Sequence, residues 1–325
     1  MHTYGAIYST STGFNLVYGV LINSLFNTAV SIFVLISGYF GINGTVKKYI
    51  KFEIQVLFYS IVSEVVISLV NSNWSIKDFI EVCLPVSSGK YWYITSYMLL
   101  LLFSKYLNRV PEKLKTKDFE KLLLLMFFIF SAVPTVVQFH VMDDGGKGFA
   151  NMLLMYFIVP YIRLYQNEEL RNPKKVFTIG LIVILLGFVL NLILTMLRGG
   201  KGVYAPFARD CSCIIIIASI AIFILFKGVR IQSKIINQIA KYVIAVYLFE
   251  GAIRTFLGQF FDITIYADRW YLFGVLLVYV LVVMAVCMMV DAIRSKIAKP
   301  IEALICDIGE KSFNLILERC EKLRM

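Results

Sequence analysis

The sequence predicts an all-α integral membrane protein, a polytopic bundle of about nine membrane-spanning helices. Of its 325 residues, 59% are apolar and only 16% are charged, whereas a soluble domain carries about 25% charged residues. The mean hydropathy is +0.77. Polar residues are therefore too few to cover a surface that faces water.

Nine apolar runs approach the length of roughly 20 residues that a helix needs to cross the hydrocarbon core. The third run is short for a full span, and the fourth and seventh are the least ambiguous. In chain order, the predicted spans are 21–42, 49–70, 91–107, 120–142, 148–166, 175–197, 207–227, 239–260 and 270–293.

The distribution of basic residues predicts how these spans are oriented, because cytoplasmic loops are enriched in Lys and Arg. Every second connection is basic: 43–51, 105–121, 163–175 and 227–241 carry 3, 6, 4 and 4 Lys or Arg, and the tail from Arg294 carries seven. Together they hold 24 of the 32 basic residues. We therefore expect the C-terminus in the cytoplasm and residues 1–20 on the far side, where the connection 71–90 has room for a short interfacial helix beginning near Ser75.

The predicted domain organisation is one integral membrane domain over residues 1–300 and a cytoplasmic tail over 301–325. In the tail, Ile301, Leu304, Ile305 and Ile308 recur at helical spacing. This spacing predicts an amphipathic helix lying on the membrane or on the bundle.

Residues 1–20 contain no basic segment followed by an apolar core and a cleavage site, so they do not form a signal peptide. Nine spans with the N-terminus outside are unusual for such a chain. Either the start of the chain inserts late, or a preceding helix is absent from this sequence, and the second is the expectation.

Several polar residues fall at membrane depth, where an ionisable group costs about 2.5–3.5 kcal/mol on insertion scales. Glu250 and Arg254 are four residues apart and share a helix face. They form either a self-compensating salt bridge or, with Tyr247, a polar wall of a substrate cavity. For Glu64, hydrogen bonding to another helix and a role in a cavity both remain open, and His140 is expected at the membrane interface.

The run LFNTAVSIFVLISGYFG (25–41) carries the polar triplet Ser37-Gly38-Tyr39 near its end. A lipid-facing helix has no use for these hydroxyls, whereas a helix that lines a polar cavity does. The alternative is that Gly38 only permits close packing of helices.

The six cysteines show neither the spacing of a zinc site nor that of a disulfide framework, and the two histidines lie far from them in the sequence. We therefore expect no metal. The net charge of +11 is spread over five loops and not gathered into one patch, so nucleic acid is not an expected partner.

Five stretches resemble the membrane-bound acyltransferase 3 family, which includes bacterial O-acetyltransferases of surface polysaccharides. In order along the chain they are SIFVLISGYF, KYWYITSYMLLLLFSKYLN, NMLLMYFIVPYIRLYQ, INQIAKYVIAVYLFEGAIR and VMAVCMMVDAIRSKIAKPIE. The resemblance implies ten membrane helices, the first of which ends near a catalytic His. His2 matches that His, while the family's Arg and most of its first helix are absent from this sequence, so this short form is expected to be inactive if that helix is essential.

The resemblance implies transfer of an acetyl group from acetyl-CoA to a hydroxyl of a cell-surface polysaccharide or glycan precursor, in a bacterial plasma membrane. His2 would act as the base, because imidazole has a pKa near ambient pH. Arg163 would bind the CoA phosphates. The expected lining of a passage for acyl group and acceptor comprises Ser37, Tyr39, Trp92, Tyr247, Glu250 and Arg254.

One departure from the family pattern is Glu250, which stands where the family more often has His. Either a carboxylate replaces imidazole in the acceptor site, or the position is structural.

Two other classes of protein remain possible from the sequence alone. A transporter or flippase for lipid-linked oligosaccharide also needs many spans and buried polar groups. Transporters often contain inverted repeats, and no internal repeat is visible here. A membrane sensor or structural protein is the third possibility.

Overall fold

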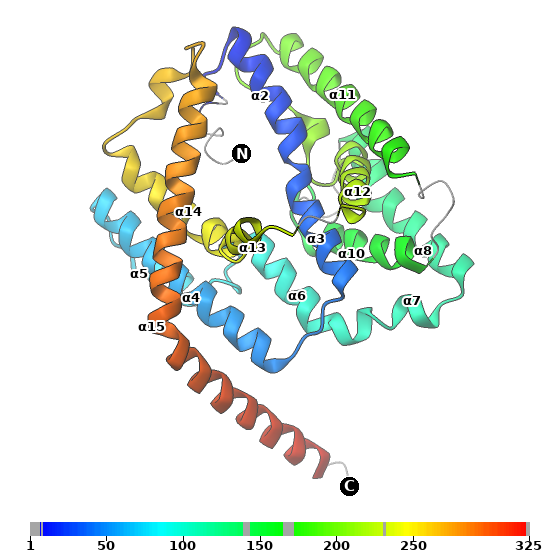
Figure 1. Cartoon of the computed structure of the whole chain (residues 1–325), viewed down its shortest axis with the longest axis vertical. Coiled ribbons are helices and arrows are strands. Elements are labelled where there is room, and N and C mark those ends of the chain that lie inside the picture. Colours follow the sequence, from blue (N-terminus) through cyan, green and yellow to red (C-terminus); the bar gives the residue numbers. More distant parts are fainter. Residues whose placement is uncertain (1–6, 8, 139–143, 165–171, 230–231, 323–325) are drawn as a thin grey trace. The chain divides into compact units, whose positions relative to one another are not determined.

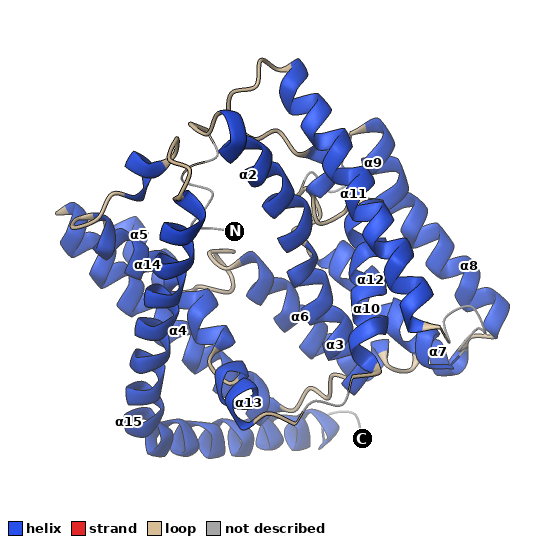
Figure 2. Ribbon diagram, turned by 45° about the horizontal axis from the view of Figure 1, so that its top comes forward, coloured by secondary structure: helices blue, strands red, loops and turns tan. Residues whose placement is uncertain are grey.

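A computed structural model describes residues 7, 9–138, 144–164, 172–229 and 232–322 (Figure 1). Within these ranges the chain forms helices joined by turns and loops, and no strand occurs (Figure 2). The predicted all-α membrane fold is confirmed.

The helices of the apolar runs follow one another in the predicted order, with short helices between them. They are α2 (Gly13–Phe26), α3 (Thr28–Phe40), α4 (Val46–Asn71), α5 (Ile76–Cys83), α6 (Trp92–Leu107), α7 (Val110–Lys113), α8 (Thr116–Phe127), the π-helix η1 (Phe128–Ala132), α9 (Val133–Val137), α10 (Phe149–Leu164), α11 (Pro173–Leu197), the 3₁₀ turn η3 (Pro206–Ala208), α12 (Cys213–Lys227), α13 (Lys234–Ala240), α14 (Val243–Gly258), the 3₁₀ turn η4 (Ile263–Tyr266) and α15 (Leu272–Lys322).

Five helical segments of the described residues are long and apolar enough to cross a membrane: Gly13–Phe40, Val46–Asn71, Thr116–Val137, Pro173–Leu197 and Leu272–Ile316. The segments Phe149–Arg163 and Cys213–Lys227 are shorter apolar helices. The remaining two predicted spans correspond to α6 and α14, each of 16 residues. Each of the nine predicted runs thus contains a helix within its described residues, and five of these helical segments have the full length of a span.

Two boundaries differ from the prediction. The first span begins at Gly13 and not at residue 21, because the apolar residues between Gly13 and Val20 continue the same helix. The short helix predicted near Ser75 is confirmed as α5, which begins at Ile76, and its place at the membrane interface stays a prediction.

The chain divides into two compact units. Unit 1 comprises residues 1–42, 103–231 and 263–276, and unit 2 comprises 43–102, 232–262 and 277–325. In unit 1, helices α11 and α12 pack closely at glycines: a Cβ on Gly187 would lie 2.6 Å from Ile214 Cγ2. In unit 2, α4 packs against α14 and α5.

The polar residues of the first span in unit 1 make hydrogen bonds to its neighbours. Asn27 separates α2 from α3, and its amide donates to Asn23 Oδ1 at 3.0 Å and to the Ala208 carbonyl at 2.5 Å. Asn191 donates to Ser24 Oγ at 3.3 Å and accepts from the Phe207 N–H at 2.9 Å. These contacts satisfy polar groups that would be costly to leave unpaired in an apolar environment.

The described residues beyond 300 belong to α15, which continues through Pro300 to Lys322. On its way it contacts the beginning of α4 within unit 2: Lys47 Nζ lies 2.8 Å from Asp307 Oδ1, and Cys306 Sγ lies 3.8 Å from the Lys47 carbonyl oxygen. The predicted amphipathic tail is therefore a helix, docked by one face on α4.

Candidate functional site

Aromatic side chains from the start of α6 and from α14 form a cluster in unit 2, called here the tyrosine cluster. Its members are Tyr91, Tyr93, Tyr97 and Tyr247. The Tyr247 ring centroid lies 6.3 Å from that of Tyr91 and 5.8 Å from that of Tyr93, and Tyr93 stacks on Tyr97 at 6.1 Å. The Trp92 ring meets Tyr93 edge-on at 6.0 Å. These spacings are those of favourable aromatic pairs.

The carbonyl of Leu248 on α14 joins three elements of unit 2. It accepts a hydrogen bond from the Tyr91 hydroxyl at 3.2 Å and one from Ser63 Oγ of α4 at 3.5 Å. Because a helical carbonyl has a second lone pair beside the one used in its own helical bond, that lone pair is shared by the two hydroxyls, with the Tyr91 contact the shorter. Helices α4 and α14 and the beginning of α6 are therefore held together next to the tyrosine cluster.

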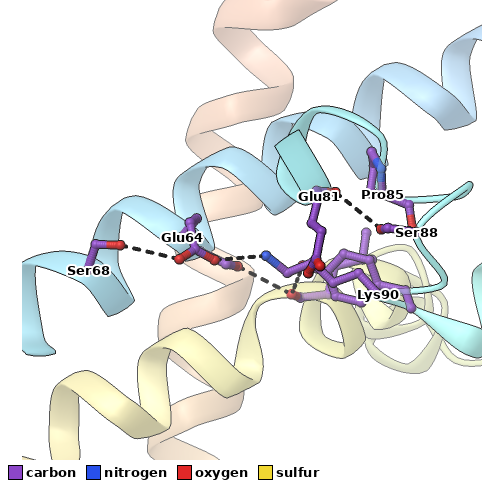
Figure 3. Close-up of polar contacts among 9 residues, drawn as sticks. Glu64, Ser68, Glu81, Pro85, Ser88 and Lys90 are labelled. Atoms are coloured by element: carbon purple, nitrogen blue, oxygen red, sulfur yellow. Dashed lines mark hydrogen bonds and ion pairs between the residues drawn. The ribbon is translucent and has the colours of Figure 1, made fainter. Parts of the chain in front are cut away.

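Two ion pairs lie on the same three elements. Arg254 Nε lies 2.6 Å from Glu250 Oε2, one turn further along α14. Lys90 Nζ lies 3.0 Å from Glu64 Oε2, and Ser68 donates to Glu64 Oε1 at 3.3 Å. Figure 3 shows Glu64 between Ser68 and Lys90. The charges of the two pairs sum to zero.

This arrangement combines aromatic rings, hydroxyls and paired charges within a few helical turns. Tyrosine presents an apolar ring face and a polar hydroxyl. The carboxylates of Glu64 and Glu250 accept hydrogen bonds from hydroxyl groups, and Lys90 and Arg254 donate to them. A sugar has the matching chemistry, with apolar C–H faces and many hydroxyls. The cluster therefore carries the kinds of group that a polyhydroxylated molecule would contact.

Four of the residues predicted to line a passage, Trp92, Tyr247, Glu250 and Arg254, belong to unit 2 and lie in or beside this cluster. The salt bridge predicted between Glu250 and Arg254 is present. Glu64, by contrast, pairs with Ser68 of its own helix and with Lys90 of the segment before α6.

The other two predicted lining residues, Ser37 and Tyr39, make their contacts in unit 1. Ser37 Oγ donates to the Phe33 carbonyl of its own helix at 2.9 Å, and the Tyr39 ring packs 5.7 Å from that of Phe223. Between them, a Cβ on Gly38 would lie 3.1 Å from the Tyr156 carbonyl oxygen of α10. The close-packing explanation for Gly38 is confirmed.

The predicted roles of the base and of the donor-binding residue are not tested by the described residues. His2 and His140 lie outside the described residues. Arg163 is an exposed residue near the end of α10, and its role toward CoA stays a prediction. Among the described residues, no group of three or more His, Cys, Asp or Glu side chains could hold a metal ion.

A buried ion network in unit 2 was missed by the sequence reasoning. Arg294 Nε lies 2.7 Å from Asp291 Oδ1, and Arg294 also pairs with Glu302. The fully buried Tyr59 of α4 donates its hydroxyl to Asp291 Oδ1 at 2.7 Å. The signal was available, since Asp291 falls inside a predicted span with Arg294 one turn later.

A second buried group lies in unit 1, in the loop before α12. Asn151 donates from Nδ2 to the carbonyls of Gly146 and Asp210, at 3.1 and 3.2 Å. Burial raises the pKa of the Asp210 carboxyl to about 6, although nearby Lys147 acts in the opposite direction. Burial also raises the pKa of the adjacent Cys211 thiol to about 11, so this cysteine is not a reactive thiolate at neutral pH.

Comparison with known proteins identifies the family. The family model described as an acyltransferase domain matches residues 1–290. No curated protein and no solved structure matches the chain. Since the match covers most of the 325 residues, and the fold is an all-helical membrane fold as the resemblance implies, the chain belongs to the membrane-bound acyltransferase 3 family.

Proposed function

We propose that this protein is an O-acyltransferase that moves an acetyl group from acetyl-CoA to a hydroxyl of a cell-surface polysaccharide or glycan precursor. Its place would be the bacterial plasma membrane, with the C-terminus in the cytoplasm. The observation that carries the proposal is the family match over residues 1–290. The tyrosine cluster and its two ion pairs support a hydroxyl-rich acceptor.

The proposed reaction is a single acyl transfer. The acceptor hydroxyl oxygen attacks the thioester carbonyl carbon while a base removes the hydroxyl proton. The C–S bond then breaks, an ester forms, and the thiolate of CoA leaves and takes up a proton. A positioned base contributes about 10²–10⁴ in rate, and His2 is the proposed base.

The donor and acceptor are assigned to different residues. Arg163 is exposed and so accessible to the CoA phosphates, which a guanidinium binds in a bidentate manner. The acceptor is assigned to the tyrosine cluster, with the Glu250 carboxylate accepting a hydrogen bond from a sugar hydroxyl. Ser37 and Tyr39 remain proposed contacts of the acyl group.

The first experiment measures acetyl transfer from labelled acetyl-CoA by membranes that contain the protein. His2→Ala is expected to lower the rate by about 100-fold or more. The matched control is His140→Ala, which removes the other of the two histidines. If both variants retain the rate of the unmodified protein, His2 is not the base.

The second experiment separates donor from acceptor binding through the two Michaelis constants. Arg163→Ala is expected to raise KM for acetyl-CoA and leave KM for the acceptor unchanged, with Arg269→Ala, at an exposed arginine, as the control. Glu250→Gln is expected to raise KM for the acceptor alone. A rise in KM for acetyl-CoA in Glu250→Gln would place this cluster on the donor and contradict the assignment.

A further inference from the structure

Helix α15 is too long to be explained by a single membrane crossing. The helix runs over 51 residues from Leu272 to Lys322, whereas roughly 20 residues cross the hydrocarbon core. At about 1.5 Å per residue, more than half of the helix must lie outside that core if its first part spans it.

The helix changes direction where it leaves its apolar part. Figure 1 shows it bending between its orange and red portions. Pro300 lies inside the helix, where it lacks the N–H that would bond the carbonyl of Lys296 and its ring clashes with that carbonyl, so that a kink is the usual result. The distal portion, residues 301–316, is called here the tail helix.

A buried ion network fixes the direction of the tail helix. Arg294 precedes Pro300, and its guanidinium pairs both with Asp291 before the bend and with Glu302 after it. All three side chains are less than one-tenth exposed. Because Tyr59 of α4 also donates to Asp291, the bend is tied to a neighbouring helix.

One face of the tail helix packs on the chain, and another is apolar and exposed. Glu302 and Cys306 are buried, and Gly309 lies against Ile50 of α4. The exposed face carries large apolar side chains that share one side of the helix at 3.6 residues per turn. These side chains are between 42% and 62% exposed: Ile301, Leu304, Ile305, Ile308, Leu315 and Ile316.

We propose that the bilayer covers this face, so that the tail helix lies in the boundary between lipid headgroups and acyl chains. The tail helix continues directly from the apolar, membrane-spanning part of α15. The membrane surface therefore lies close to the point where the tail helix begins. Exposed basic residues lie before the tail helix (Lys296, Lys299), within it (Lys311) and beyond it (Arg319), and they suit the phosphates of anionic lipids. The exposed Asp307 of the tail helix is paired with Lys47. The exposed apolar side chains then avoid water without a protein partner.

The test uses thiol reactivity in proteoliposomes of anionic phospholipid that hold on average less than one full-length chain per vesicle. Leu304→Cys places a thiol on the apolar face. Ala303→Cys places one on the neighbouring exposed position, one residue round the helix and away from that face. N-ethylmaleimide crosses bilayers but reacts with thiolates, which form only in water, so Leu304→Cys is expected to react about 10-fold or more slowly than Ala303→Cys. The two rates should become equal after unfolding in dodecyl sulfate.

Peptide mass spectrometry resolves the engineered thiol from the native cysteines, and equal melting temperatures confirm that both variants fold. Ile308→Cys replaces Leu304→Cys if the latter is unstable. Equal rates in proteoliposomes would overturn the proposal. So would protection in native membranes that is lost in proteoliposomes, because the cover would then be another protein or a second copy of the chain.

Discussion

The Lys90 ammonium lies 3.0 Å from the Glu64 carboxylate, which is one of the few charged groups in the middle of the apolar helix α4. Their side chains are 25% and 21% exposed. Because Lys90 belongs to the segment just before α6, this contact compensates a charge at membrane depth and fixes the segment that carries the tyrosine cluster.

Breaking this pair is expected to destabilise the protein. Glu64→Gln and Lys90→Gln should each lower the free energy of unfolding in detergent by about 1–2 kcal/mol, since each leaves a half-buried charge without its partner. In a double-mutant cycle the coupling energy should be about 1 kcal/mol.

The exposed pair of Lys77 and Glu81, 3.8 Å apart on α5, is the matched control. Its coupling energy should stay below about 0.5 kcal/mol. Equal coupling in the two cycles would show that the pair of Glu64 and Lys90 is screened as if at the surface.

Removing the Arg294 guanidinium should have a larger effect. Arg294→Met leaves the buried carboxylates of Asp291 and Glu302 close together without a cation, which is expected to cost about 3–5 kcal/mol. The fraction of monodisperse protein after mild heating, measured by size-exclusion chromatography, should fall sharply. Arg319→Met, at an exposed arginine of the same helix, should change it little, and similar losses in both variants would contradict the role of the network.

Adding a methyl group at Gly38 tests the close contact of α3 with α10. A Cβ there would lie 3.1 Å from the Tyr156 carbonyl oxygen and 3.3 Å from Val159 Cβ. Gly38→Ala should therefore lower stability by about 1–3 kcal/mol. Gly274→Ala meets no atom within 4 Å and should be neutral or stabilising, because alanine favours a helix by about 1 kcal/mol over glycine. The comparison is made by thermal unfolding in one detergent.

The buried carboxyl of Asp210 predicts a pH dependence of stability. Its pKa rises from 3.8 to about 6 in the folded protein, so between these values the native state keeps a proton that the unfolded chain releases. Stability therefore falls as the pH rises through this window, by about 3 kcal/mol in total.

Asp210→Asn should remove this decline, so that the variant gains stability over the unmodified protein at pH 7 but not at pH 4. Asp118→Asn, at an exposed aspartate, serves as the control. A difference between Asp210→Asn and the unmodified protein that does not change with pH would rule out the buried carboxyl as its source. Melting curves at a series of pH values measure the difference in stability between Asp210→Asn and the unmodified protein.

Several features of this protein follow from its sequence alone. Each of the nine apolar runs contains a helix within its described residues, the helix expected near Ser75 begins at Ile76, and Glu250 pairs with Arg254. These features depend on the length of an apolar run or on residues one helical turn apart, and both are local properties of a chain whose backbone must satisfy its own hydrogen bonds in lipid.

Other features were decided only by the tertiary structure. The sequence showed Tyr91 and Tyr247, Glu64 and Lys90, and Tyr59 and Asp291 as separate residues, and the fold makes contacts of them. The tertiary structure also shows that Gly38, a candidate cavity residue in the sequence, is a packing contact between helices. The reason is that hydropathy and helical periodicity determine which segments enter the membrane, whereas the choice of neighbouring helix depends on the fit and hydrogen bonding of side chains far apart in the chain.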